Sequence, residues 1–462
     1  MTQTTRRLAL RSLATAPLAS AGIMIAACGQ QEQAPGAPAG KPSSAGSQLR
    51  GAVTFWAINA PWGQMSQGEG GRLLADFRAK HPQLAIEVDD VVPSGPSSVE
   101  KLHTAAAAGT MPDLFMANRG YAAQLGAEGL SRPLDAYLKQ SRALPRNDLW
   151  ESHLEDASWK GQLYAITHSS GVWVLFVNRQ LWQESGLDPD RPPKTWAELE
   201  DAARKATRMS GGEPDRVGYH PTWGNAGNSL WLVHYRQTGG DYFTSDWRPA
   251  FVNDDRVIGV FSWMKGFVDR QGGMQALEDL RKQVQASIGS SGAGIFASNR
   301  IASLIDSHTI ITDLEQGAPD VHFSVAPLPL PPGGRQSGWQ GGADLHLAKD
   351  SRAPDAGWAI IEHLMAPENI LAFALALSRI PSRKSVGQSK AYLEKSPYHK
   401  VFVEVVPASH NVPIMPGNFE LAPIISGITA DILAGKRSVR EALSDAAQQT
   451  SVVVEKWRRY LT

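Results

Sequence analysis

Cysteine is nearly absent from this sequence, in which 462 residues include a single one, Cys28. One cysteine excludes an internal disulfide framework and any zinc or iron–sulfur site built from several cysteines. Net charge is absent as well, because 45 Lys and Arg residues balance 45 Asp and Glu residues. Without a basic excess to neutralise phosphates, we expect no nucleic-acid partner.

The motifs of the common cofactor-dependent and hydrolytic enzymes are also missing. The chain contains no GxSxG, no Walker A and no HExxH motif, and its 12 histidines are scattered rather than paired at metal-ligand spacing. Residues 292–297 match GxGxxA, but no strand pattern precedes them. We therefore expect no cofactor, no metal ion and no catalytic residue, and predict that the protein is not an enzyme.

Long apolar runs are confined to the N-terminus. Residues 1–27 carry Arg6, Arg7 and Arg11 and no acidic residue, and from Leu13 onwards they are small and apolar. A charged start followed by a short apolar stretch predicts a secretory signal peptide, because a membrane-spanning helix needs about 20 apolar residues. Residues 5–11 also resemble a twin-arginine motif, so both export routes remain open.

The signal peptide ends in Ile-Ala-Ala-Cys, which resembles a bacterial lipobox with Cys28 as the lipidated residue. Residues 28–49 are rich in Gln, Pro, Ala, Gly and Ser and predict a flexible linker. The remaining chain would carry 42 basic and 45 acidic residues. We expect an exported protein that Cys28 anchors to the outer face of the cell membrane or to its periplasmic side.

Strand and helix patterns alternate through the rest of the chain. Three Ser/Thr–Glu pairs predict helix caps, namely Ser97 with Glu100, Thr195 with Glu198 and Ser438 with Glu441. The apolar runs predict strands at 53–58, 84–88, 113–116, 171–178, 301–306, 322–328 and 345–349. This rhythm indicates the α/β class with a parallel sheet.

Several segments, in order, resemble the extracellular solute-binding proteins of ABC importers, the branch that includes maltose-binding protein. The segments that carry the resemblance are VTFW, FRAKHP, EKLHTAAAAGTMPDLFMAN, AEGLSRPLDAYL, GQLYAITHSSGVWVLFVNRQLWQESGLDPDRPPKTWAELEDAARKA, APLPLPPGG, GGADLHLAKDS, APEN and RIPSRKSV. Two departures are Thr167, where proline is usual, and Phe176-Val177, which replaces a common tyrosine pair. The resemblance does not extend through residues 210–295.

The resemblance implies a two-lobed periplasmic-binding-protein-like fold of type II, with a ligand cleft between lobes joined by crossover strands. It places lobe one at 50–169 plus 331–379 and lobe two at 170–330 plus 380–462. It also implies a monomeric binding lipoprotein that captures a small-molecule solute, a sugar, by hinge closure and delivers it to ABC permease subunits.

Candidate ligand-binding residues follow from the chemistry of sugars, whose apolar faces suit aromatic side chains and whose hydroxyls need fixed polar partners. Open α/β sheets bind ligands at the carboxyl ends of their strands, which selects loops that follow strands. The paired Gly341-Gly342 indicates a close backbone approach. The candidates are Trp56, Asn59, Trp62, Asn118, His168, Trp223, Asp306, His308, Trp339, Asp344 and Phe419.

Most of the 14 tryptophans are predicted to be core residues instead. These are Trp150, Trp159, Trp173, Trp182, Trp196, Trp231, Trp263, Trp358 and Trp457, which fall on helical or strand positions. Three alternatives to a sugar importer stay open. They are the same fold binding a non-sugar solute, a secreted glycoside hydrolase with two carboxylates across a cleft, and a lipid-anchored scaffold without a ligand.

Overall fold

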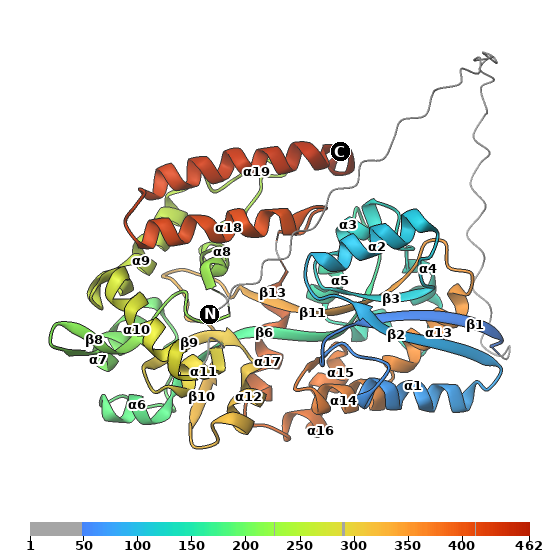
Figure 1. Ribbon diagram of the computed structural model, residues 1–462, viewed down its shortest axis with the longest axis horizontal. Helices are drawn as coiled ribbons and strands as arrows, with labels where there is room; N and C mark the ends of the chain where they lie inside the picture. The colour runs from blue at the N-terminus through green and yellow to red at the C-terminus, as the bar shows by residue number, and fades with distance from the viewer. Residues whose placement is uncertain (1–48, 226, 289–291, 412) are drawn as a thin grey trace, which may run out of the picture. The chain divides into compact units, whose positions relative to one another are not determined.

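The computed structural model describes residues 49–225, 227–288, 292–411 and 413–462 (Figure 1). The predicted signal peptide, Cys28 and the linker up to residue 48 lie outside these residues. Within the described ranges no single helix is long and apolar enough to cross a membrane; only the pair α13 (Pro354–Leu364) and α14 (Pro367–Ala376), bent by 65°, meets the length and composition test together.

The first three strands form a parallel group. Strand β1 (Gly51–Ile58) lies between β2 (Leu84–Val92) and β3 (Leu114–Asn118) and is parallel to both. Helices α1 (Gly68–Lys80) and α2 (Ser97–Ala108) connect them in turn. The alternation of strands and helices predicted for this part of the chain is confirmed.

Strand β6 (Ile166–Asn178) has 13 residues, all of them buried. Up to Val172 it pairs with β11 (Gly338–Leu347) and β12 (Ile380–Pro381). From Trp173 onwards it pairs with β9 (Ile301–Ser307) and β10 (Phe323–Ala326). Because β11 also pairs with β3, β11 and β6 lie side by side between the parallel group and a second group of strands that begins with β9 and β10.

The second group continues from β9 to β8 (Glu213–Tyr219), which is parallel to it, and to the edge strand β7 (Arg208–Ser210). The sheet order is β2-β1-β3-β11-β6-β9-β8-β7. Around this group come α6 (Arg179–Glu184), α7 (Trp196–Ala206), η2 (Gly227–Ser229), α8 (Leu230–Gln237), α9 (Asp255–Arg270), α10 (Gly273–Ile288), α11 (Gly292–Ala297) and α12 (Ile310–Gly317).

Shorter elements and the C-terminal helices complete the fold. Before β6 lie α3 (Ala122–Ala127), α4 (Asp135–Gln140), η1 (Arg146–Asp148), α5 (Glu151–Asp156), β4 (Ser158–Trp159) and β5 (Gln162–Leu163). After β11 lie α13 (Pro354–Leu364), α14 (Pro367–Ala376), α15 (Lys384–Gly387), α16 (Lys390–Leu393), α17 (His399–Val405), η3 (Val406–Ala408), β13 (Ser409–His410), α18 (Asn418–Leu433) and α19 (Val439–Leu461). The last two helices pack side by side (Figure 1).

Two of the three predicted helix caps are confirmed. Thr195 with Glu198 and Ser438 with Glu441 each form a complete capping box. The cap predicted at Ser97 is wrong, because Pro96 already has helical backbone angles and Ser97 lies inside the first turn. An N-cap residue needs an extended backbone for its side chain to reach the third amide of the helix.

Two strands extend beyond their predicted starts through internal glycines. The strand expected from Gly171 begins at Ile166, and the one expected at 345–349 begins at Gly338 and ends at Leu347. As a result Trp339 and Asp344 lie within β11 rather than in a loop, whereas Trp56 lies within β1, in the strand predicted at 53–58. Glycine is common in loops and therefore suggests the end of a strand, but here it allows neighbouring strands to pack closely.

The tryptophans predicted as core residues are all buried, the most exposed being Trp159 and Trp263 at 9%. Six histidines are also buried, and this burial lowers their pKa; the pKa of His153 falls well below its ordinary value. The pKa of His168, His220, His308 and His346 falls to about 3 and that of His234 to about 4. Burial acts in the opposite direction on Asp306 and Asp344, whose pKa it raises to about 6.

We expect the stability of the protein to fall steeply as the pH drops below 6.5. Each of the six histidines takes up a proton in the unfolded chain near its ordinary pKa of about 6.5 but stays neutral in the fold, which costs roughly 1 kcal/mol per histidine per pH unit. The two buried carboxyls, Asp306 and Asp344, oppose this loss of stability. Between about pH 6 and pH 4 they bind protons more readily in the folded protein than in the unfolded chain, which favours folding. Urea unfolding at pH 7.5 and pH 5.5 measures the net effect, which the histidines dominate.

His168 and His103 provide a matched pair of variants. His168 packs edge-on against Phe373 and is buried, whereas His103 is exposed on α2 and contacts Glu128. His168→Phe should reduce the pH dependence by about one histidine's share, whereas His103→Ala removes an exposed histidine and should change it less. Equal effects of the two substitutions would contradict the assignment of acid sensitivity to burial.

Candidate ligand-binding site

A cavity of about 250 Å³ lies where β6 and β11 meet the segment that begins α18. Its described lining residues come from five parts of the chain: β6, β11, the loop after β8 with η2 and α8, residues 411 and 413, and the first two turns of α18. They are Trp173, Asn225, Ser229, Leu232, Val233, Trp339, Asn411, Pro413, Asn418, Phe419, Ala422 and Ile425. The cavity is therefore built by segments far apart in the sequence.

A stacked pair of tryptophans forms one side of this cavity. The rings of Trp173 and Trp339 are 4.7 Å apart and inclined by only 20°. The small residue Gly341 makes room for this pair, since a Cβ there would lie 2.3 Å from the Trp339 ring. Gly342 has a φ of +137°, and a Cβ there would lie 2.0 Å from the carbonyl oxygen of Ser169. The close approach predicted for these two glycines is confirmed.

Amide and hydroxyl groups supply the polar part of the lining, through Asn225, Ser229, Asn411 and Asn418. Among the described lining residues, the Trp173 indole N–H and the Asn418 Oδ1 are buried without a hydrogen-bond partner. A buried polar atom left unpaired costs about 1–3 kcal/mol, so a ligand that offers hydroxyl groups would recover this energy. None of the described lining residues carries a charged side chain.

A buried ion pair supports the cavity from behind. Arg119 donates a hydrogen bond of 2.7 Å to Asp156, and both side chains are almost fully buried. The same carboxylate accepts from the backbone N–H of Asn411 at 2.9 Å and from Gln340 Nε2 at 3.2 Å. Asp156 therefore links β11, the end of β3 and the lining residue Asn411.

Asp306 holds the loop that follows β8. Its carboxylate accepts from the backbone N–H of the lining residue Asn225 at 2.9 Å and from that of Ser307 at 2.6 Å. The surroundings are tight, because a Cβ at Gly292 would lie 2.0 Å from an Asp306 oxygen. Asp344 has a comparable supporting position, accepting from the Thr167 hydroxyl at 2.8 Å.

His308 connects two chain segments at the centre of the sheet. The backbone N–H of Val172 on β6 donates to Nδ1 at 3.3 Å, and Nε2 lies 2.8 Å from the Ser378 carbonyl oxygen. This pattern requires the neutral ring with its proton on Nε2, which agrees with the lowered pKa. A Cβ at Gly171 would lie 3.0 Å from the His308 ring, so this glycine leaves room for it.

The structure gathers only part of the predicted ligand-binding set around the cavity. Trp339 and Phe419 line it, and Asp306, His308 and Asp344 lie behind it. The other six lie elsewhere: Trp56 is beside Lys101, Asn59 is exposed, Trp62 is beside Arg379, Asn118 accepts from the N–H of Gly95, His168 packs on Phe373 and Trp223 stacks on His220.

Sequence reasoning did not select Trp173, Asn225, Asn411 or Asn418 as binding residues. Trp173 was assigned to the core, and it is indeed only 5% exposed. The available signal was its position, since Trp173 follows closely after the predicted lobe boundary between residues 169 and 170. Asn225 and Asn411 follow strands, and Asn418 is the first residue of α18. The sequence around them has no distinguishing pattern.

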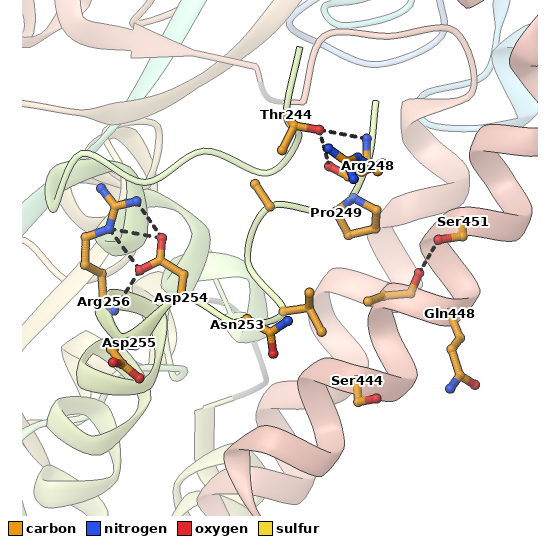
Figure 2. Close-up of a pocket in the computed structure, with 13 residues that line it drawn as sticks. Thr244, Arg248, Pro249, Asn253, Asp254, Asp255, Arg256, Ser444, Gln448 and Ser451 are labelled. Carbon is orange, nitrogen blue, oxygen red and sulfur yellow. Dashed lines mark hydrogen bonds and ion pairs between the residues drawn. The ribbon is translucent and has the colours of Figure 1, made fainter. Parts of the chain in front are cut away.

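A wider groove of about 900 Å³ lies between the loop 244–256 and α19 (Figure 2). Its charged lining residues already have partners: Arg256 pairs with Asp254, Arg248 with Asp246, and Asp255 with Arg440. The groove has no stacked aromatic pair among its described lining residues. The smaller cavity is therefore the better candidate for ligand binding.

Residues 72–398 match the family model of the bacterial extracellular solute-binding proteins. The chain belongs to this family. The mannitol-binding protein of Pseudomonas aeruginosa is similar to this solute-binding protein, with 25% identity over 82% of the present chain and 88% of its own length. The family description places its members outside the cell, which agrees with the predicted export.

Solved structures establish the fold of this solute-binding protein. The cyclic α-maltosyl-1,6-maltose binding protein of Arthrobacter globiformis has a TM-score of 0.73 and 21% identity, covering 88% of this chain and all of its own. UgpB of Mycobacterium tuberculosis, in complex with glycerophosphocholine, has a TM-score of 0.72 and 19% identity, with coverage of 89% and 100%. The predicted two-lobed fold of type II is confirmed.

We expect Asp156→Ala to destabilise the solute-binding protein by about 3–5 kcal/mol, because Arg119 would remain buried without a counter-ion. Glu151→Ala is the matched control, since Glu151 pairs with Arg146 at 3.6 Å while both side chains are more than half exposed. An exposed pair contributes less than about 1 kcal/mol. Urea unfolding of both variants measures the difference, and similar small losses in both would contradict the structural role of Asp156.

Proposed function

We propose that this protein binds a neutral carbohydrate in the cavity beside Trp173 and Trp339 and delivers it to the permease of an ABC importer. The observation that carries the proposal is the combination of a stacked aromatic pair with uncharged amide groups and unpaired buried polar atoms. Aromatic faces pack against the C–H faces of sugars, and amides exchange hydrogen bonds with hydroxyls.

The uncharged lining favours a neutral ligand over an ionic one. UgpB of Mycobacterium tuberculosis is recorded with glycerophosphocholine, and a relative from Agrobacterium fabrum, 28% identical over 32% of this chain and 28% of its own length, is named for sn-glycerol-3-phosphate. A buried phosphate needs arginine, lysine or backbone donors, and a buried cation needs carboxylates. The described lining offers neither kind of charged side chain.

The same lining favours binding without hydrolysis. A glycoside hydrolase needs a pair of carboxyl groups about 5–9.5 Å apart across the substrate. No carboxyl side chain occurs among the described lining residues of the cavity. Asp306 and Asp344 do not line it: backbone amides donate to both oxygens of Asp306, and the Thr167 hydroxyl donates to one oxygen of Asp344.

Hinge closure of two lobes, 50–169 plus 331–379 against 170–330 plus 380–462, is the proposed mechanism. The support lies in β6, whose two parts pair with different strand groups, and in His308, which contacts both β6 and Ser378. A ligand that contacts both lobes only when they are closed shifts the equilibrium towards the closed state. The protein acts as a monomer, without catalysis.

The ligand prediction is tested by thermal-shift and calorimetric titration with neutral mono- and oligosaccharides, glycerophosphocholine and putrescine. A bound ligand at a hundredfold excess over Kd adds about 2.7 kcal/mol of apparent stability. At least one neutral sugar should raise the melting temperature, and the two charged solutes should not. A shift only with a charged solute, or with none of the panel, would overturn the proposal.

For the sugar that binds, Trp339→Ala should weaken the affinity by about tenfold or more, because it removes half of the aromatic platform. Trp247→Ala is the control, since Trp247 is partly buried against Trp159 and Phe243 and does not line the cavity. Unchanged affinity in the Trp339 variant would place the ligand elsewhere.

The anchor is tested separately, because residues 1–48 lie outside the described ranges. We propose that Cys28 becomes the lipidated first residue after the signal peptide is removed, whether export follows the general secretory or the twin-arginine route. Cys28→Ser should abolish incorporation of radiolabelled palmitate and shift the protein from the membrane to the soluble fraction. Retention of the label in the variant would show that another residue carries the lipid.

A further inference from the structure

A second hollow, of about 510 Å³, adjoins the candidate site on the far side of Phe419, and this outer groove is not assigned to any role above. Helix α2, the region of α3, the start of α18 and the end of α19 line it. Phe419 is the only described residue that lines both the cavity and the outer groove. Its ring therefore stands between the two spaces.

Consecutive residues of α18 divide the two spaces. Asn418 lines the cavity, Glu420 lines the outer groove and Phe419 lines both. This start of the helix is held in place by α19, because Trp457 donates to Glu420 at 2.8 Å and packs so closely on Gly417 that a Cβ there would lie 2.1 Å from its Nε1. The backbone of residues 417–420 is thus fixed, and the Phe419 side chain is the movable part.

Tyr121 completes the partition from the opposite side. Its ring stacks on that of Phe419 with centroids 3.7 Å apart and planes inclined by 19°. Tyr121 is buried at the end of β3, whereas Phe419 is only partly buried. Rotation of Phe419 away from Tyr121 would join the cavity to the outer groove without moving the main chain.

The outer groove has the chemistry of a sugar-binding surface. Tyr121, Phe419, Trp457 and Tyr460 contribute aromatic rings to its lining, and Glu100 contributes a carboxylate that can accept hydrogen bonds from hydroxyls. The other charged lining groups are partly paired, Glu420 with Lys456 and Glu128 with His103. Pockets that enclose drug-sized ligands measure about 300–1,000 Å³, so the cavity alone suits a short sugar. The cavity and the outer groove together fall within that range.

We propose that the Phe419–Tyr121 stack is a partition that determines ligand length, and that the outer groove binds the additional units of an oligosaccharide once Phe419 is displaced. The inference rests on the proposed carbohydrate function. With the partition in place, the cavity accepts one or two units and gains nothing from further ones.

The test is calorimetric titration with malto-, manno- and galacto-oligosaccharides of one to five units. The wild-type protein should bind disaccharide and tetrasaccharide of the recognised series with similar affinity. In Phe419→Ala, affinity for every length falls because a platform is lost, but the preference for tetrasaccharide over disaccharide should rise by about two- to tenfold, the range of one aromatic contact. Circular dichroism verifies folding of each variant.

Two double variants locate the additional units. Phe419→Ala with Tyr460→Ala should lose the new length preference, because Tyr460 lines the outer groove. Phe419→Ala with Tyr398→Ala should keep it, because Tyr398 is a half-buried tyrosine at a separate depression near Arg179. An unchanged length preference in Phe419→Ala, or an equal effect of the two tyrosine substitutions, overturns the inference while leaving the carbohydrate function intact. Absence of binding by every sugar overturns both.

Discussion

The pairing of β6 is the constraint on which the rest of the structure depends. Thirteen consecutive buried residues form one strand, yet its two parts have different neighbours, β11 and β12 before Trp173 and β9 and β10 after it. A strand in this position must satisfy its backbone hydrogen bonds on both sides all along its length. The change of partners opens the space that Trp173 lines, so the candidate site follows from the sheet topology.

Polar groups around this strand stabilise its surroundings. His308 joins β6 to Ser378, Asp306 holds the loop with Asn225, and Asp156 neutralises Arg119 while accepting from Asn411. Each is buried, so each imposes one hydrogen-bonding arrangement on its neighbours. The uncharged cavity is thus surrounded by a charged and titratable second layer that positions its amides.

Local signals in the sequence were sufficient for much of the fold. The capping boxes at Thr195 and Ser438 formed as predicted because both partners lie within one helical turn, and β1 to β3 followed from apolar runs between helices. The cap at Ser97 failed because the backbone of Pro96, which a pattern does not report, is already helical. The extra lengths of β6 and β11 depend on cross-strand packing at glycines.

The site was less predictable, because register and long-range packing decide it. Trp339 and Phe419 were selected by position and resemblance, and both line the cavity. Trp173 was assigned to the core, since a buried strand residue and a cavity-lining residue have the same sequence pattern. Asn411 is held at the cavity by its hydrogen bond to the Gln340 carbonyl of β11, and Asn418 begins α18, which packs against η2. No local signal in the sequence records these contacts.

The uncharged lining of the cavity also has a kinetic consequence. A neutral solute, the kind proposed for this uncharged lining, experiences no long-range attraction from the protein's charges, so salt has no such attraction to screen. Encounter is then left to diffusion, so the rate of capture is the same in dilute and in saline surroundings. Discrimination between solutes then depends on how long each one stays bound, that is, on its dissociation rate.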